Sequence, residues 1–191
     1  MGAAIYQTIS FSRHAVLNCQ TSKIVPGSDM RPSSIRVLVV EDHEAWSRFI
    51  SSVLQSESEL EVCELVSDGL EAVQRAEELQ PDLILLDIGL PTLNGIEVAR
   101  RIREVSPASK VLFVSETRSS EIAKEALNTG ASGYVVKSDA GRELLPAIKA
   151  VLQGKKFVSR SLAGHFLVAV MVATTQTNLI ESMVRLISAI C

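Results

Sequence analysis

The sequence has few cysteines and no long apolar run, and each shortage excludes a class of protein. Its three cysteines, Cys19, Cys63 and Cys191, are far apart and odd in number, which argues against a disulfide framework and against a zinc site. The longest apolar run, at 166–173, is much shorter than the roughly 20 residues that span a bilayer. We therefore expect a cytoplasmic protein with no membrane partner.

An excess of positive charge is also absent. The formal net charge is -3 at pH 7, so no global basic field indicates a nucleic-acid partner, and we expect none to be bound directly. Apolar residues, in contrast, make up 47% of the 191 residues, which is enough for a sizeable core. These values are typical of one globular domain with extensions.

The two ends of the chain differ in composition from the middle. Residues 1–34 are rich in Ser, Thr and small residues; we favour a flexible tail or a true start at Met30, and a transit peptide is the alternative. Residues 157–191 are too few for a DNA-binding output module, but 178–190 have the spacing of a capped amphipathic helix. Its wide apolar side must be buried on the central domain, on a second copy in a homodimer or on a partner. We therefore divide the chain into an N-terminal extension at 1–34, a domain at 35–156 and a C-terminal extension at 157–191.

Between residues 35 and 153, apolar runs alternate with stretches of helical periodicity. The runs, which predict strands, lie at 35–40, 61–66, 83–86, 110–115 and 133–136. Helices are predicted at 44–56, at 69–79 with Asp68 as the cap, after Asn94 as a cap, after Ser119 or Ser120, and after Ser138 or Asp139. This alternation indicates right-handed βαβ units, hence an α/β fold with a doubly wound, five-stranded parallel sheet and helices on both faces. Pro146 falls inside the last helix and should either kink it or delay its start.

Chemically active side chains stand where four of these strands end. Glu41 and Asp42 follow the first run, Asp87 follows the third, Ser115 ends the fourth, and Lys137 follows the fifth. Singly, each also fits a plain structural role such as a turn or a cap, but the carboxyl ends of parallel strands meet at one edge, where ligands bind. Neighbouring carboxylates repel one another unless a cation lies among them, and hard oxygen ligands favour Mg²⁺. A metal beside an ammonium and a hydroxyl predicts phosphoryl transfer.

These residues lie in motifs that resemble a known family, the receiver domain of two-component response regulators. The motifs are VLVVEDH at 37–43, LILLDIGLPTLNGIEV at 83–98, VLFVSE at 111–116 and GYVVKSD at 133–139, in the family's order and spacing. The resemblance implies a flavodoxin-like sheet of strand order 2-1-3-4-5. It also implies a phosphorelay switch that promotes only its own phosphorylation and dephosphorylation and is otherwise not an enzyme.

The resemblance assigns a role to each member of the site. Asp87 would be the phosphoacceptor, receiving its phosphoryl group from a sensor histidine kinase or a phosphotransfer protein. Mg²⁺ would be held by the carboxylates of Glu41, Asp42 and Asp87 and by the backbone carbonyl of Gly89. Ser115 and Lys137 would bind phosphoryl oxygens, and Tyr134 would turn inward as Ser115 moves. The face formed by the fourth helix, fifth strand and fifth helix would then bind a downstream protein partner.

Two departures from the family's pattern are expected to modulate the site. Glu116 follows Ser115 where the family usually has a small residue, so we expect Glu116→Ala to change the lifetime of the phosphorylated form. Gly89 replaces a bulkier residue and opens the site again. His43 is interpreted as a neighbour of the acid pair and not as a ligand, because a hard cation prefers oxygen. The alternative hypothesis is a degenerate receiver that acts as a phosphorylation-independent interaction or dimerisation module.

Overall fold

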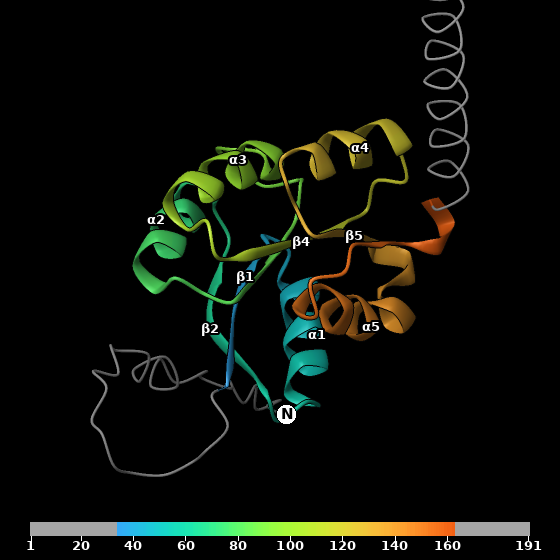
Figure 1. The fold of residues 1–191 in the computed structure, drawn as a ribbon, viewed down its shortest axis with the longest axis horizontal. Coiled ribbons are helices and arrows are strands. Elements are labelled where there is room, and N and C mark those ends of the chain that lie inside the picture. The colour runs from blue at the N-terminus through green and yellow to red at the C-terminus, as the bar shows by residue number, and fades with distance from the viewer. Residues whose placement is uncertain (1–33, 163–191) are drawn as a thin grey trace, which may run out of the picture.

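The computed structural model describes residues 34–162, and Figure 1 shows strands and helices alternating through this part of the chain. The strands are β1 (Ile35–Val40), β2 (Leu60–Val66), β3 (Leu83–Leu86), β4 (Lys110–Ser115), β5 (Gly133–Val136) and β6 (Phe157–Val158). The helices are α1 (Glu44–Gln55), α2 (Gly69–Leu79), α3 (Gly95–Val105), α4 (Ser120–Asn128), the short 3₁₀ helix η2 (Lys137–Asp139) and α5 (Ala140–Leu152).

All six strands pair in parallel in the order β2-β1-β3-β4-β5-β6. This confirms the α/β fold with a doubly wound parallel sheet and its 2-1-3-4-5 order. The sheet differs from the prediction in one respect, because β6 adds a sixth strand beside β5. A run of two residues is too short to show any periodicity, so this strand could not be predicted from the sequence.

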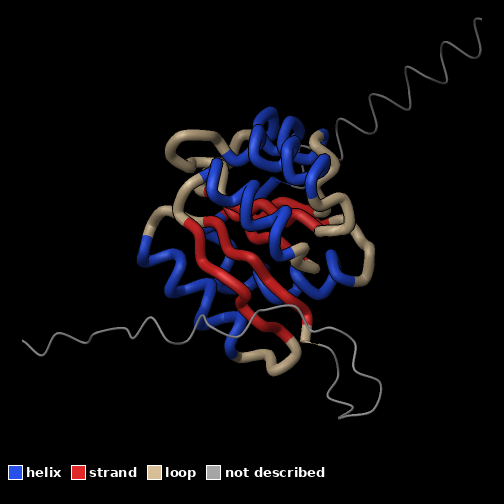
Figure 2. Tube along the Cα trace, turned by 90° about the vertical axis from the view of Figure 1, so that its left-hand side faces the viewer, coloured by secondary structure: helices blue, strands red, loops and turns tan. Residues whose placement is uncertain are grey.

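Helices cover both faces of the sheet, as the tube in Figure 2 shows with helices on either side of the strands. The side chains of β1 alternate between the two faces: Leu38 and Val40 pack on the side of α2, α3 and α4, and Val37 and Val39 pack on the side of α1 and α5. Because both faces of the inner strands β1, β3, β4 and β5 are buried, these strands are apolar almost throughout, which is why they appear as unbroken runs in the sequence. The central strand β3 is buried along its whole length.

Three of the predicted capping residues do cap their helices. Asp68 accepts hydrogen bonds from the amides of Leu70 and Glu71 at the start of α2, Asn94 accepts one from Glu97 at the start of α3, and Ser119 accepts one from Ile122 at the start of α4. Each bond satisfies an amide that has no partner inside the helix. These caps fix where the loops at the carboxyl edge of the sheet end.

Helix α5 contains Pro146 and is not delayed by it, since the helix begins at Ala140, directly after η2. Pro146 lies on the exposed side of the helix, as does Arg142 one turn earlier. The proline has no amide hydrogen to donate to the carbonyl of Arg142, so α5 lacks that one hydrogen bond.

Within residues 34–162, no helix is long and apolar enough to cross a bilayer. The predictions for the N-terminal extension up to residue 33 and for the amphipathic helix at 178–190 lie outside the described residues.

Candidate functional site

The carboxyl ends of β1, β3, β4 and β5 meet at one edge of the sheet and bring the predicted site residues together. Glu41 and Asp42 follow β1, Asp87 follows β3, Ser115 ends β4 and Lys137 begins η2 after β5. Ladder pairing places Val40 opposite Leu86 and Ser115 opposite Val136, so the four strands end at the same level. All of these side chains are buried except that of Asp42, which is exposed at the rim.

Lys137 lies between two buried carboxylates. Its Nζ is 2.9 Å from Asp87 Oδ2 and donates a second hydrogen bond of 2.9 Å to Glu41 Oε1. The residues are only 4% (Lys137), 5% (Asp87) and 3% (Glu41) exposed, so water contributes little to their solvation. One ammonium thus balances two carboxylates, and the site keeps an excess of negative charge.

The pKa values of this group reflect burial and mutual contact. Burial raises the pKa of Glu41 above its usual value, against the lowering effect of its hydrogen bond to Lys137. Burial alone would lower the pKa of Lys137, but hydrogen bonds to Glu41 and Asp87 and their charges raise it on balance. Lys137 is therefore a cation at neutral pH.

The carboxylate of Asp87 is held at both oxygens. Oδ2 accepts from Lys137, and Oδ1 accepts a 2.7 Å hydrogen bond from the amide of Ile88. The Asp87 backbone is fixed as well: its amide donates to Val40 O, and Gly95 packs directly on it. A Cβ at Gly95 would lie 2.0 Å from the carbonyl oxygen of Asp87, so only glycine allows α3 to begin this close to the site.

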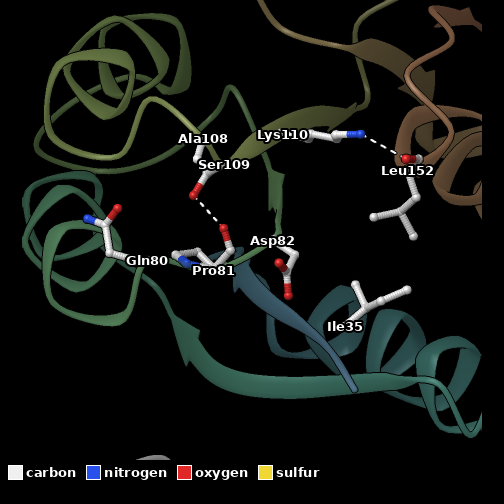
Figure 3. A pocket seen from close by; sticks show the side chains of 8 residues that line it. All are labelled: Ile35, Gln80, Pro81, Asp82, Ala108, Ser109, Lys110 and Leu152. Atoms are coloured by element: carbon white, nitrogen blue, oxygen red, sulfur yellow. Dashed lines mark hydrogen bonds between the residues drawn. The ribbon is translucent and has the colours of Figure 1, made fainter. Parts of the chain in front are cut away.

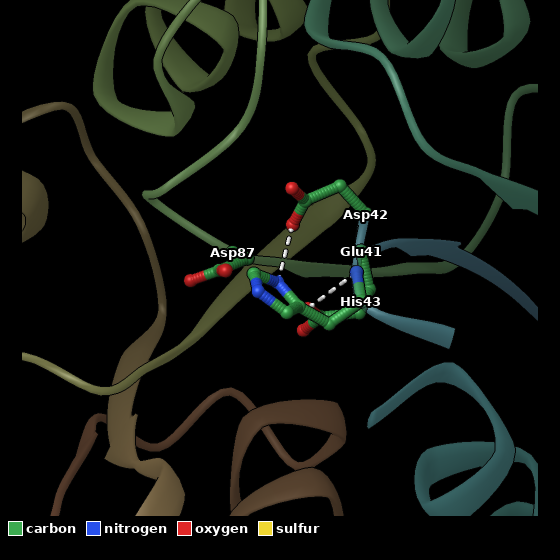
Figure 4. A group of neighbouring side chains, drawn as sticks. All are labelled: Glu41, Asp42, His43 and Asp87. Carbon is green, nitrogen blue, oxygen red and sulfur yellow. Dashed lines mark hydrogen bonds and ion pairs between the residues drawn. The ribbon is translucent and has the colours of Figure 1, made fainter. Parts of the chain in front are cut away.

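Figure 4 shows the four groups at this edge that could hold a metal: Glu41, Asp42, His43 and Asp87 each offer a ligand atom, and these atoms lie within 4.8 Å of one another. Glu41 Oε2 is buried and, although 2.8 Å from Lys137 Nζ, accepts no hydrogen bond of good geometry. Three carboxylates of which one has a buried oxygen without such a bond fit a hard divalent cation such as Mg²⁺.

His43 pairs with Asp42 at the rim of this cluster. Its Nδ1 lies 2.8 Å from Asp42 Oδ1, and this hydrogen bond and the carboxylate's charge raise the pKa of the exposed imidazole. Its backbone amide donates to Glu41 Oε1 at 3.2 Å. His43 thus orients both acids, as expected for a neighbour of the acid pair.

Ser115 and Tyr134 are linked through the backbone of Thr117. The amide of Thr117 donates to Ser115 Oγ at 3.3 Å, and the hydroxyl of Tyr134 donates to Thr117 O at 3.0 Å. Tyr134 is fully buried, with its ring 6.3 Å from that of Phe113, and burial raises its phenol pKa. In this structure Tyr134 is therefore turned inward, and one residue, Thr117, connects it to Ser115.

The two modulating residues lie on the solvent side of the site. Gly89 is exposed, and a Cβ there would lie 3.6 Å from Asp87 Oδ2, so a side chain at this position would stand beside that oxygen. Glu116 is exposed directly after Ser115.

Two contacts of the site were missed by the sequence analysis. The indole of Trp46 in α1 lies below Lys137, whose Nζ is 5.3 Å from the ring centroid, close enough for a cation–π contact. Trp46 falls on the apolar stripe of its helix, so nothing in the sequence distinguishes it from a core residue. The contacts of Thr117 are made by its backbone, which no sequence pattern reveals.

A separate hollow lies at the opposite edge of the sheet, at the amino ends of β1, β3 and β4 (Figure 3). Its volume is about 330 Å³, and its charged groups are engaged: Asp82 accepts from the amide of Arg36, and Lys110 Nζ donates to the carbonyls of Val151 and Leu152. Lys110 thus caps the end of α5 and is not part of the acidic site.

Known proteins resemble this chain in both sequence and fold. A family model described as the response regulator receiver domain matches residues 37–149. The transcriptional regulatory protein LnrK of Bacillus subtilis is 32% identical over 133 residues, which cover 70% of this chain and 60% of that protein. The transcriptional regulatory protein DegU of Brevibacillus brevis is 34% identical over 126 residues, 66% of this chain and 53% of its own length. A solved two-component response regulator of the LuxR family from Aurantimonas sp. SI85-9A1 has a TM-score of 0.66 at 32% identity, covering 69% of this chain and 94% of that one.

These relatives correct one prediction. Both curated relatives are named as transcriptional regulatory proteins, so the exclusion of nucleic acid from the partners is wrong. The exclusion rested on the net charge of this chain, which spans only 60% and 53% of the lengths of those relatives. A net charge averages over the whole surface and therefore cannot exclude a nucleic-acid partner.

Proposed function

Because the chain belongs to the response regulator receiver family, we propose that it is a phosphorelay switch in which Asp87 accepts a phosphoryl group from the phosphohistidine of a sensor kinase or a phosphotransfer protein. The observation that carries this proposal is the buried Lys137 ammonium, which contacts the Asp87 and Glu41 carboxylates at 2.9 Å. A cation that is fixed in a buried acidic site can stabilise the negative charge of a phosphoryl group that arrives there.

The chemistry follows from the positions of the side chains. An Asp87 oxygen attacks phosphorus, the bond between phosphorus and the histidine nitrogen breaks, and the imidazole leaves with its electron pair and takes up a proton. Lys137 exchanges part of its contact with Asp87 for an oxygen of the transferred group, and Ser115 donates its hydroxyl hydrogen to another. Because Oδ1 is held by the Ile88 amide and Oδ2 by Lys137, the carboxylate is oriented before the donor arrives.

The site also fits Mg²⁺, which the carboxylates of Glu41, Asp42 and Asp87 and the carbonyl of Gly89 would hold. When bound, the ion neutralises negative charge on the transferred phosphoryl group.

The switch is proposed to act through Ser115 and Tyr134. A phosphoryl group on Asp87 draws the Ser115 hydroxyl toward it, which loosens the bond from the Thr117 amide and shifts the loop that accepts from Tyr134. That loop leads into α4, so the face of α4, β5 and α5 changes and binds a downstream protein partner. The names of the relatives support transcriptional control as the output of the whole protein.

Two further statements belong to the same proposal. The chain promotes only its own phosphorylation and dephosphorylation and acts as an enzyme on no other molecule. It works in the cytoplasm, which the few and widely spaced cysteines support.

Intact mass spectrometry after incubation with Mg²⁺ and acetyl phosphate tests the proposal. We expect the parent chain to gain the mass of one phosphate, Asp87→Asn to gain none, and the control Asp82→Asn, at the opposite edge of the sheet, to gain as much as the parent. A parent chain that gains no phosphate would contradict the switch.

The second candidate is a degenerate receiver that binds its partners, or a second copy, without phosphate. The exposed carboxylate of Glu116 next to Ser115 favours it, since negative charge repels a phosphodonor. It predicts that Asp87→Asn leaves partner binding unchanged, whereas the switch predicts that Asp87→Asn abolishes the response to acetyl phosphate.

A further inference from the structure

The last residues that the structure describes are packed against the strand that carries the site lysine. Val158 pairs with Tyr134, and the amide of Ser159 donates to Tyr134 O at 2.9 Å. The side chain of Ser159 is fully buried, and that of Leu162 is 1% exposed within the core that also contains Tyr134. We refer to residues 157–162 as the β6 strap. It lies beyond residue 149, where the match to the family model ends.

The pairing between β5 and β6 ends before the last buried amide of β5 finds a backbone acceptor. The last paired residue of β5 is Tyr134, opposite Val158, yet the amide of Val136 is buried and needs an acceptor. Ser159 Oγ supplies it, at 2.9 Å. A side-chain hydroxyl thus replaces the backbone carbonyl that a longer strand would provide.

This bond fixes the residue directly before Lys137, and a second contact fixes the turn directly after it. Ser161 Oγ donates to Asp139 Oδ2 at 2.6 Å. Asp139, the residue before α5, makes no side-chain capping bond to that helix. The β6 strap therefore contacts the chain on both sides of Lys137, at the backbone amide of Val136 and at the side chain of Asp139.

The close fit of the strap to β5 depends on a glycine. A Cβ at Gly133 would lie 2.8 Å from the Phe157 carbonyl oxygen and 2.9 Å from Leu112 Cδ1. Because Gly133 has no side chain, β6 can lie this close to β5, and the strap is an integral part of the sheet.

From these contacts we infer that Ser159 is a positioning residue of the phosphoryl site: by holding the Val136 amide it fixes the end of β5, and with it the direction from which Lys137 reaches Asp87 and Glu41. The inference rests on the proposed function for its catalytic consequence. The working unit of the switch therefore extends to the β6 strap. Any movement of the chain that follows the strap acts on Lys137, and phosphorylation acts on the strap in return.

The test compares Ser159→Ala with the matched control Ser106→Ala in the full chain. Ser106 is also a buried serine, 1% exposed, and its hydroxyl bonds to Gln80 and Ser109 near the opposite edge of the sheet. Both variants lose a buried hydroxyl, so both lose some thermal stability. Only Ser159→Ala is expected to be phosphorylated more slowly, by about tenfold at saturating acetyl phosphate and Mg²⁺, because misplacing a catalytic group has effects of this order or larger.

A second measurement needs no phosphorylation. In Ser159→Ala, native-state hydrogen exchange should speed up at the amides of Val136 and Lys137, about tenfold more than at the amide of Val114 in β4. In Ser106→Ala, the amides of Val136 and Lys137 should exchange at the parent rate. Equal effects of the two variants in either measurement would overturn the positioning role. If the parent itself gains no phosphate, the proposed function fails, and the exchange rates still decide whether Ser159 positions Lys137.

Discussion

At the residue scale, the site is organised around one buried cation. Lys137 contacts Glu41 and Asp87 at once, and it lies over Trp46, so its ammonium is held from three directions. Removing one partner of a buried ion pair leaves an uncompensated buried charge, which costs more than the pair itself contributes. Here one of the residues left without this partner would be Asp87, the proposed phosphoacceptor.

Lys137→Met is therefore expected to destabilise the protein by about 3 kcal/mol at pH 8 in the presence of a chelator, because two buried carboxylates lose their counter-charge. Mg²⁺ should raise the melting temperature of this variant more than that of the parent, because the divalent cation then neutralises the two carboxylates. Urea and thermal unfolding with and without Mg²⁺ measure both effects.

Lys110→Met is the control for that experiment. Lys110 is also partly buried, but it donates to the carbonyls at the end of α5 and contacts no carboxylate of the site. Its loss should lower stability without changing the response to Mg²⁺. An equal response of the two lysine variants to Mg²⁺ would contradict the conclusion that Lys137 balances the negative charge of the site.

At the scale of elements, the start of α3 lies against the backbone of Asp87. Gly95→Ala places a methyl group 2.0 Å from the Asp87 carbonyl oxygen, and backbone on both sides leaves nothing flexible to give way. We expect a loss of about 1–3 kcal/mol together with slower phosphorylation by acetyl phosphate.

Gly141→Ala is the matched change for that variant, because Gly141 lies in α5 and a Cβ there meets nothing within 4 Å. It should raise stability by about 0.5–1 kcal/mol, as expected for alanine inside a helix. Chemical denaturation and intact mass spectrometry of both variants separate helix propensity from the contact with Asp87. A Gly95→Ala chain as stable as Gly141→Ala would show that α3 does not rest on Asp87.

The cap of α2 gives a prediction about pH. A hydrogen bond from Thr92, together with those from the amides of Glu71 and Leu70, lowers the pKa of Asp68 below its ordinary value of 3.8. The folded protein thus binds this proton less tightly than the unfolded chain, so the cap stabilises the fold above pH 3.8 and its contribution is lost as the pH falls through the lowered value. Asp68→Ala should therefore lower the melting temperature at pH 7, and its difference from the parent should shrink below pH 3.8.

Glu77→Ala, an exposed change on the same helix, is the control for the cap. Melting curves followed by circular dichroism from pH 3 to pH 7 provide the comparison. A difference between Asp68→Ala and the parent that stays constant over this range would mean that the Asp68 charge has no part in the cap.

At the scale of the whole molecule, the switch predicts that assembly follows phosphate. Sedimentation of the parent with Mg²⁺ and acetyl phosphate should differ from that of the untreated chain or, with an added partner, show a new complex, and Asp87→Asn should show neither change. A dimer of equal stability in both chains, with and without acetyl phosphate, would favour the degenerate receiver.

Much of this molecule could be predicted from its sequence because the strands are buried on both faces. Runs such as the one ending at Asp87 are then continuous and sharply bounded, and their ends locate the site. The caps Asp68, Asn94 and Ser119 were predictable because a side-chain oxygen before an amphipathic stretch has few other uses. The strand order came from the resemblance and was confirmed by the structure.

What the sequence did not reveal depends on contacts without a periodic signal. The β6 strap pairs through only two residues, Trp46 falls on the apolar stripe of its helix, and Thr117 acts through its backbone. Ser159 is one serine among many, and only its position beside Val136 gives it a role. The nucleic-acid prediction failed for a different reason, because it was drawn from the net charge of the chain, and a net charge does not identify binding partners.

The contact between Gly95 and Asp87 has a mechanical consequence. With no side chain between the two backbones, Asp87 and the first turn of α3 are in direct contact, and this wall of the site has little room to yield. The opposite wall, at the ends of β4 and β5, is joined by single hydrogen bonds through Ser115, Thr117 and Tyr134. We therefore expect a phosphoryl group on Asp87 to displace the opposite wall more readily, so that the proposed signal leaves toward α4 and the β6 strap instead of toward α3.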